Sequence, residues 1–212
     1  MKVEVLRENL KSSLVVTERV AGKNISLPIL NNVLISTEEN FLSFTSTDLE
    51  VAIKLWIVVK ILKNGTVVVP AKFLTSFVNS LPNEKITVEA NDQNVRVECK
   101  NVKTQIQGFN PEDFPLIPQI KDAIEIQVDV RKLQTGLSQI IDIASQSQSR
   151  PEISGIYFSF SKNSIKVVAT DSFRLGEKNI HLEESLKKDC SFILPQKAAR
   201  EILNLLETKE GL

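Results

Sequence analysis

The residues that could carry acid–base chemistry in this sequence are two aspartates, each directly after a threonine. Asp48 follows Thr47 and Asp171 follows Thr170, in two similar stretches of the chain. A pair of carboxylates can serve as general acid and general base. An aspartate at the end of a strand also commonly caps a turn through hydrogen bonds to its own backbone, and we favour this structural role for both residues.

The chain has few residues that could support other kinds of catalysis. His181 is the only histidine, so neither a Ser-His-Asp triad nor a histidine-rich metal site is expected. The patterns GxxxxGK[ST] and GxGxxG do not occur, which argues against phosphate-cradling loops. Cys99 and Cys190 lack the spacing of metal ligands, and we expect two reduced, mostly buried thiols of a cytoplasmic protein. The sequence therefore predicts no cofactor and no metal.

Bulk composition limits the function further. The chain has 212 residues, which is room for two ordinary domains. Basic and acidic residues are balanced at 26 each, so any nucleic-acid site must come from local segregation of charge. The first ten residues, MKVEVLRENL, are charged and carry no long apolar run, so we expect neither a signal peptide nor a membrane span.

An internal repeat organises the chain. When the sequence is shifted by 123 positions, ten pairs are identical over 48 gap-free positions, where chance would give about three. The pairs include Val5/Val128, Leu10/Leu133, Leu14/Leu137, Ala21/Ala144, Pro28/Pro151, Asn40/Asn163, Thr47/Thr170 and Asp48/Asp171. After two inserted residues, Val69–Lys72 falls on Leu194–Lys197. A repeat of this length indicates a duplicated domain.

Each copy is predicted to be α+β, in the order β-α-β-β-β-β-α-β-β-β with mostly antiparallel pairing. In the first copy we expect helices at 7–21 and 71–80. The strands are expected at 2–6, 32–37, 41–47, 51–59, 66–69, 85–90, 94–99 and 102–107. Asn64 and Gly65 predict a hairpin turn before the strand at 66–69. In the second copy, an apolar helical stripe is formed by Leu133, Leu137, Ile140, Ile141 and Ala144.

The boundary between the copies is predicted from prolines. The segment 109–118 carries three of them and can continue neither a strand nor a helix, so it opens a linker over 109–123. We expect one complete domain at 1–123 and a second at 124–212. Leu212 corresponds to about residue 87 of the first copy, so the second copy is expected to lack three strands. We expect either a fragment or a native context that supplies the missing part.

Five stretches give the chain a family resemblance. They are Leu27–Asn32, Thr47–Glu50, Val69–Lys72, Pro111–Pro115 and Ala169–Leu175. Together with the duplication they resemble the bacterial DNA polymerase III beta sliding clamp. The resemblance implies the DNA clamp fold, with two helices on antiparallel sheet in each domain. The family has three such domains, so this chain would hold the first, a truncated second and no third.

The resemblance also implies a function without catalysis. Two subunits of the family form a ring around duplex DNA and tether a polymerase, so the chain is expected to be a processivity factor and accessory subunit, not an enzyme. Contacts to phosphates must be weak and independent of sequence. The positions expected to touch DNA are Lys23, Asn24, Lys72, Gln146, Ser147, Gln148, Arg150 and Lys197, with Arg200 beside them. An ordinary solvated turn, loop or helix face is the alternative at each.

A second implied site binds short peptide motifs of partner proteins. These partners are the polymerase catalytic subunit, the clamp loader and repair polymerases. The matching positions are Ile153, Thr170, Ser172, Phe173, Arg174 and Leu175. An apolar surface with a guanidinium at its rim fits an extended peptide with hydrophobic anchors. Many family members have Gly and then His or Tyr where this chain has Ser172 and Phe173. Because the rest of the family's pocket is expected to be missing, we expect weak or absent peptide binding.

The family's ring contact suggests a third group. It comprises Phe73, Phe77, Leu81, Thr104 and Ile106, with core packing as the alternative for Phe77 and Leu81. Two other functions remain open at this stage. One is a clamp-like fragment or decoy that does not encircle DNA. The other is an unrelated two-lobed enzyme with a cleft near the linker at 109–123.

Overall fold

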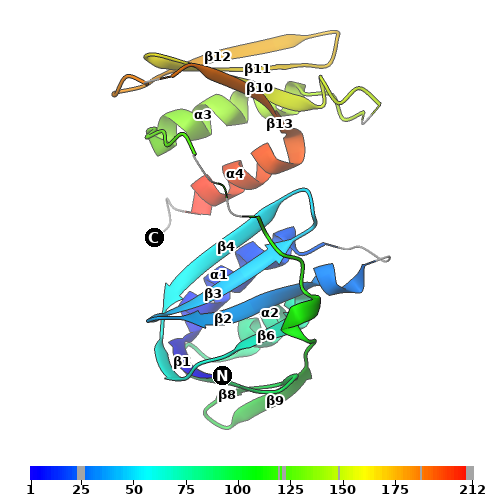
Figure 1. The fold of residues 1–212 in the computed structure, drawn as a ribbon, viewed down its shortest axis with the longest axis vertical. Helices are drawn as coiled ribbons and strands as arrows, with labels where there is room; N and C mark the ends of the chain where they lie inside the picture. Colours follow the sequence, from blue (N-terminus) through cyan, green and yellow to red (C-terminus); the bar gives the residue numbers. More distant parts are fainter. Residues whose placement is uncertain (23–26, 119, 121–122, 148, 187, 209–212) are drawn as a thin grey trace. The chain divides into compact units, whose positions relative to one another are not determined.

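The computed structural model describes residues 1–22, 27–118, 120, 123–147, 149–186 and 188–208. The chain divides into two units, Met1–Gln119 and Ile120–Leu212, which we call unit 1 and unit 2. Figure 1 shows the elements of each unit.

Unit 1 contains two α-helices and two antiparallel sheets. Its elements are β1 (Lys2–Leu6), α1 (Arg7–Val20), the 3₁₀ helix η1 (Pro28–Asn31), β2 (Asn32–Glu38), β3 (Phe41–Thr47), β4 (Ala52–Val58), β5 (Lys60–Lys63), β6 (Thr66–Pro70), α2 (Ala71–Ser80), β7 (Lys85–Asn91), β8 (Asn94–Cys99), β9 (Val102–Gln107) and η2 (Pro111–Asp113). The strand order is β5-β1-β7-β8-β9 in one sheet and β4-β3-β2-β6 in the other.

The core of unit 1 follows from the apolar periodicity of its elements. In α1, Leu10, Leu14 and Thr17 recur with helical spacing and are buried. The charges of Glu8 in the first turn and Arg19 in the last turn interact favourably with the helix dipole. The two helices pack against each other, and one apolar cluster joins them to both sheets. The predicted α+β fold, with two helices on antiparallel sheet, is confirmed in this unit.

Two details of the predicted topology are wrong. The strand expected at 51–59 is β4, but the strand that follows it, β5 at Lys60–Lys63, was not predicted and belongs to the other sheet. Asn64 and Gly65 are therefore not a hairpin turn, because β5 pairs with β1 while β6 pairs with β2. The glycine is required by close packing instead, since a Cβ on Gly65 would lie 2.9 Å from the Met1 nitrogen.

The proline-rich segment after β9 packs on unit 1. The Phe109 N–H donates to the Val68 carbonyl over 2.9 Å, and Phe114 is buried. Gly108 makes this approach possible, because a Cβ there would collide with the carbonyl oxygens of Val68 and Gln93. The beginning of the predicted linker is thus attached to β6.

Unit 2 repeats part of this arrangement. Its elements are α3 (Val130–Ile140), the 3₁₀ helix η3 (Ile141–Ile143), β10 (Gly155–Ser161), β11 (Ser164–Thr170), β12 (Leu175–His181), β13 (Cys190–Pro195) and α4 (Gln196–Thr208). The sheet order β12-β11-β10-β13 corresponds to β4-β3-β2-β6 of unit 1. Both helices lie on one face of this sheet (Figure 1). The bounds of β10, β11 and β12 are those of β2, β3 and β4 moved by 123 residues.

The start of unit 2 departs from the repeat. Residues 125–129 correspond to β1 but do not form a strand. In unit 1 the backbone of β1 is bonded on both sides, to β5 and to β7. Among the described residues of unit 2, no strand pairs with 125–129, so this segment has no ladder of hydrogen bonds to hold it. The apolar stripe of the following helix is confirmed, with Leu137, Ile140, Ile141 and Ala144 buried and Leu133 packed against them.

None of the helices in the described part of the chain has the length and apolar character of a membrane span.

Candidate functional site

The end of β3 in unit 1 is closed by a threonine–aspartate turn. The Thr47 hydroxyl donates to the Val51 carbonyl over 2.9 Å, and it accepts the Leu49 N–H over 3.0 Å. One carboxylate oxygen of Asp48 accepts the N–H groups of Glu50 and Val51, at 3.0 and 2.9 Å. Leu49 has a φ of 75°, in the left-handed region.

The same turn closes β11 in unit 2. The Thr170 hydroxyl donates to the Arg174 carbonyl over 2.8 Å, and Asp171 accepts the N–H groups of Phe173 and Arg174 over 3.0 and 2.9 Å. These N–H groups hold the pKa of the Asp171 carboxyl below its ordinary value. The turn-capping role predicted for Asp48 and Asp171 is confirmed by these bonds.

The backbone conformation at Ser172 explains why the family resemblance leads one to expect a glycine there. Its φ is 77°, a conformation that costs glycine nothing and other residues about 1 kcal/mol or more. The glycine that the family resemblance leads one to expect would therefore be the unstrained choice at this position. Ser172 keeps the same backbone shape, as Leu49 does in unit 1.

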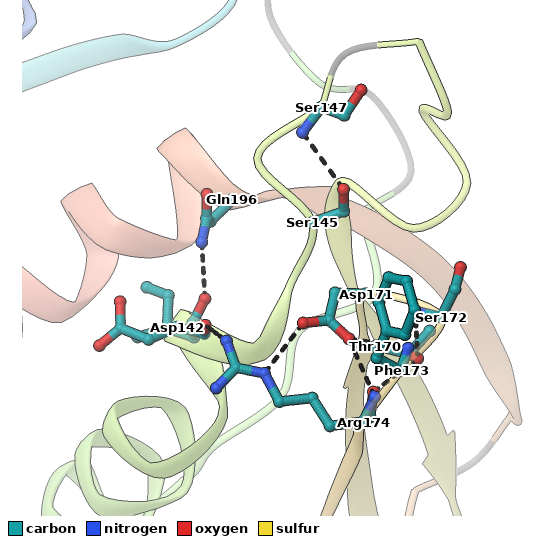
Figure 2. Close-up of polar contacts among 10 residues, drawn as sticks. Asp142, Ser145, Ser147, Thr170, Asp171, Ser172, Phe173, Arg174 and Gln196 are labelled. Carbon is teal, nitrogen blue, oxygen red and sulfur yellow. Dashed lines mark hydrogen bonds and ion pairs between the residues drawn. The ribbon is translucent and has the colours of Figure 1, made fainter.

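Arg174 is held at two points beside the turn (Figure 2). Its Nε donates to the second carboxylate oxygen of Asp171 over 2.9 Å. Its Nη2 donates to the backbone carbonyl of Asp142, in η3, over 3.0 Å. A guanidinium has five N–H donors, so three remain that make no hydrogen bond to the described residues. This arginine is therefore oriented, while still offering donors to a ligand.

The support of Arg174 extends to the start of α4. Arg200 forms an ion pair of 2.6 Å with the Asp142 carboxylate. The amide of Gln196 donates to the Ile141 carbonyl over 2.7 Å. Two residues of α4 thus hold the short helix η3, whose carbonyl in turn holds Arg174.

Five of the six positions predicted for peptide binding lie in or beside this turn. Thr170, Ser172, Phe173 and Arg174 form the turn itself, and Leu175 begins β12. Phe173 and Leu175 are 98% and 67% exposed, so the turn presents apolar surface to solvent.

Ile153 is linked to the turn indirectly, by hydrogen bonds that involve Arg150. The Ile153 N–H donates to the Arg150 carbonyl over 3.2 Å, and the Arg150 guanidinium donates to the Ser172 hydroxyl over 3.3 Å. Ile153 is half-buried. The structure thus brings five of the six predicted positions together in or beside the turn, and Ile153 is linked to them only through Arg150.

The positions predicted to touch DNA are only partly described. Lys23, Asn24 and Gln148 lie outside the described residues. The other five are exposed: Lys72, Gln146, Ser147, Arg150 and Lys197. Within the loop that follows η3, the Ser145 hydroxyl accepts the Ser147 N–H over 3.2 Å (Figure 2).

The predicted ring contact needs a correction. Leu81 and Ile106 are each 4% exposed and belong to the core of unit 1, so they offer almost no surface to a partner. Phe73 is 55% exposed, and Phe77 and Thr104 are half-buried. The last three remain as candidates for a contact between subunits.

Sequence reasoning missed Asp142 and Gln196, and it placed Arg200 toward DNA. A comparison of the two copies could have singled out Gln196 and Arg200, which align with Ala71 and Thr75, but it gives no such signal for Asp142, which aligns with the charged Arg19. Arg174 and Arg200 align with Val51 and Thr75, so charge appears in unit 2 where unit 1 has none.

No group of three or more His, Cys, Asp or Glu side chains in the described residues could hold a metal ion. Cys99 is buried and Cys190 is half-buried, and both are free thiols.

Comparisons with known proteins give matches over nearly the whole chain. The model of the DNA polymerase III beta subunit N-terminal domain matches residues 1–118, and that of its central domain matches residues 127–212. The beta sliding clamps of Staphylococcus aureus and Staphylococcus epidermidis are each 26% identical over 99% of this chain. The chain spans 58% of the length of these relatives.

Solved structures agree with these matches. The DNA polymerase III subunit beta of Pseudomonas aeruginosa is similar with a TM-score of 0.91 and 26% identity, over 97% of this chain and 56% of that one. The sliding clamp of Bacillus subtilis has a TM-score of 0.92 over the same shares, and its identity of 23% supports the fold alone.

Proposed function

This chain belongs to the DNA polymerase III beta subunit family, and on that basis we propose that the whole protein is a sliding clamp for the replicative DNA polymerase. The observation that carries the proposal is the match of both units, in order, to two domains of the family. The clamp would encircle duplex DNA without reading its sequence and would keep the polymerase from dissociating. Its role is that of a cytoplasmic, non-catalytic accessory subunit.

We assign residues 1–123 to the first clamp domain and 124–212 to the second. Each carries the threonine–aspartate turn between corresponding strands. The duplication thus supports the assignment through hydrogen bonds as well as through identities.

Contact with DNA is assigned to polar side chains of exposed loops and helix starts. Lys72 and Lys197 lie in the first turns of α2 and α4, and Gln146, Ser147 and Arg150 lie in the loop before β10. Lys23, Asn24 and Gln148 complete this assignment from the sequence. Such groups hold phosphates without base recognition, and the balance of 26 basic and 26 acidic residues keeps the overall attraction weak.

Partner binding is assigned to the turn at Thr170–Leu175 with Ile153 beside it. The exposed apolar surface of Phe173 and Leu175 would accept hydrophobic anchors, and the free N–H groups of Arg174 would donate to a carbonyl or carboxylate. The expected partners are the polymerase catalytic subunit, the clamp loader and repair polymerases. A solved sliding clamp of Pseudomonas aeruginosa, 26% identical to this chain, is bound to griselimycin.

Ring formation between two subunits is assigned to Phe73, Phe77 and Thr104. They belong to α2 and to β9, which is an edge strand of its sheet. Pairing across subunits would cover the edge that β9 leaves open in unit 1.

Fluorescence anisotropy tests the partner site. The probe is a labelled peptide that carries the clamp-binding motif of a bacterial replicative polymerase, titrated with the 212-residue chain up to millimolar concentration. We expect weak, saturable binding that Arg174→Ala lowers at least severalfold. The control is Lys162→Gln, an exposed residue in the turn between β10 and β11. Equal binding by wild type and Arg174→Ala would sink the assignment of this site.

A further inference from the structure

The orientation of Arg174 depends on residues that lie outside the turn. Its Nη2 bonds to the Asp142 carbonyl, 32 positions away in the chain. The Asp142 carboxylate is paired with Arg200, which lies 58 positions after Asp142 in the chain. Figure 2 shows Arg174 between Asp171 and Asp142, with the Gln196 side chain bonded to the same short helix η3. A change in α4 would therefore reach Arg174 through η3.

Unit 1 shows that the turn does not need this support. The turn after β3 has the same threonine and aspartate hydrogen bonds, and Leu49 has the left-handed conformation at the position that corresponds to Ser172. The positions of Arg174, Arg200 and Gln196 are taken there by Val51, Thr75 and Ala71. Thr75 bonds instead within its own helix, to the Ala71 carbonyl over 2.8 Å. The contacts of Arg174 in unit 2 are thus not required to fold the turn.

We propose that Asp142, Gln196 and Arg200 are positioning residues that fix the Arg174 guanidinium for peptide recognition. The proposal rests on the proposed function of the same surface. Gln196 and Arg200 hold η3 from α4, and η3 presents the Asp142 carbonyl to one Nη2 hydrogen of Arg174. The remaining N–H donors are then already in place for a peptide carbonyl or carboxylate. The long arginine side chain does not have to become ordered when the peptide binds. Such preorganisation lowers the entropic cost of binding.

The same contacts give Arg200 a new role. Its guanidinium is bonded to the Asp142 carboxylate, and within the described residues it makes no hydrogen bond to the turn at 170–174. We therefore assign Arg200 to the support of the peptide site instead of to DNA.

The test follows the Arg174 Nε–H signal by NMR in the ¹⁵N-labelled 212-residue chain, together with peptide affinity by anisotropy. Arg200→Gln and Asp142→Asn each remove the ion pair and leave the Asp142 carbonyl in place. We expect both to shift the Nε–H signal and speed its exchange with water. Because exposed ion pairs contribute little individually, peptide affinity should fall about two- to fivefold. Arg200→Lys keeps the positive charge, so it should recover part of the wild-type Nε–H signal and part of the wild-type peptide affinity.

The controls separate this inference from the proposed function. Lys162→Gln should change neither measurement, and Arg200→Gln should cost nothing further in an Arg174→Ala background. If wild type binds peptide and Arg200→Gln matches it, with an unmoved Nε–H signal, the positioning role is wrong and the peptide site stands. If wild type binds no peptide up to millimolar concentration, this chain alone does not form a partner site, and the role of Arg174 in peptide recognition by this chain is wrong. The Nε–H signal then still decides whether Arg200 orients Arg174, and an unmoved signal would overturn that as well.

Discussion

A carboxylate that accepts two backbone N–H groups is stabilised in its charged form, and Asp171 does so in the turn after β11. The two donors are the backbone N–H groups of Arg174 and Phe173. Arg174 also donates from its side-chain Nε to the other carboxylate oxygen. The backbone bonds are the main reason that the pKa of Asp171 is lowered. One aspartate thereby shapes the turn and orients the arginine at its rim.

Acid should therefore loosen this turn in a defined range of pH. The folded-state pKa of Asp171 is below that of an unperturbed aspartate, roughly 3.9. Its contribution to stability is present above that value and is lost as the pH falls through the folded pKa. NMR titration should show the amide signals of Phe173 and Arg174 moving together with a midpoint below that of an unperturbed aspartate. A midpoint at or above the ordinary value would contradict the bonds described for Asp171.

The sequence indicated some of these residues and not others, for a physical reason. The turn is local, because a threonine and an aspartate bond to backbone groups two to four positions away. It could therefore be predicted from Thr170 and Asp171 alone. The contact of Arg174 with Asp142 depends on how α3 and η3 pack on the sheet, which no local pattern determines. Leu81 was likewise left between a partner contact and the core, because an apolar residue after a helix can face either, and its burial supports the core.

At the scale of elements, hydrogen-bonding partners decide which segments become strands. Residues 2–6 form β1 because β5 and β7 flank them, whereas 125–129 find no such neighbours in the described part of unit 2. Apolar alternation is present in both copies, so it could not distinguish them. Likewise, Asn64 and Gly65 indicate a change of direction but not that β5 and β6 enter different sheets.

The close approach of the segment after β9 to β6 should make Gly108 irreplaceable. A Cβ at this position would meet backbone oxygens of Val68 and Gln93, which cannot rotate away. Gly108→Ala should lower the free energy of unfolding by about 1–3 kcal/mol, measured by urea denaturation. Gly22→Ala is the matched control, since its nearest neighbours would be at 3.4 Å, an ordinary contact. An equally small effect of both changes would show that the segment is not held on β6 as described.

At the scale of the whole molecule, the two copies share an architecture and differ in charge placement. The strands β2, β3 and β4 recur as β10, β11 and β12 with identical lengths. Arg174 and Arg200 occur in unit 2 without basic counterparts at Val51 and Thr75. This pattern is consistent with the partner site proposed for unit 2. The family and the fold were accessible from the sequence because the repeat and the five short stretches extend over the whole chain.

Binding of DNA should be weak, independent of sequence and sensitive to salt. We expect the affinity of the chain for duplex DNA to fall as salt rises from 50 to 200 mM, as roughly expected for phosphate contacts. Lys72→Gln and Lys197→Gln should each reduce the slope of log affinity against log salt by about 1, while Lys162→Gln leaves it unchanged. Binding that depends on base sequence, or slopes that neither lysine affects, would argue against the assigned DNA contacts.

The most direct test compares the two turns in one experiment. The ¹⁵N-labelled chain is titrated with the unlabelled clamp-binding peptide, and the backbone amide signals of Thr47–Val51 and Thr170–Leu175 are followed together. We predict that the signals of Thr170–Leu175 shift and saturate, together with that of Ile153, while those of Thr47–Val51 stay in place. Equal shifts in both turns, or shifts confined to other parts of the chain, would contradict a partner-binding role for the turn in unit 2.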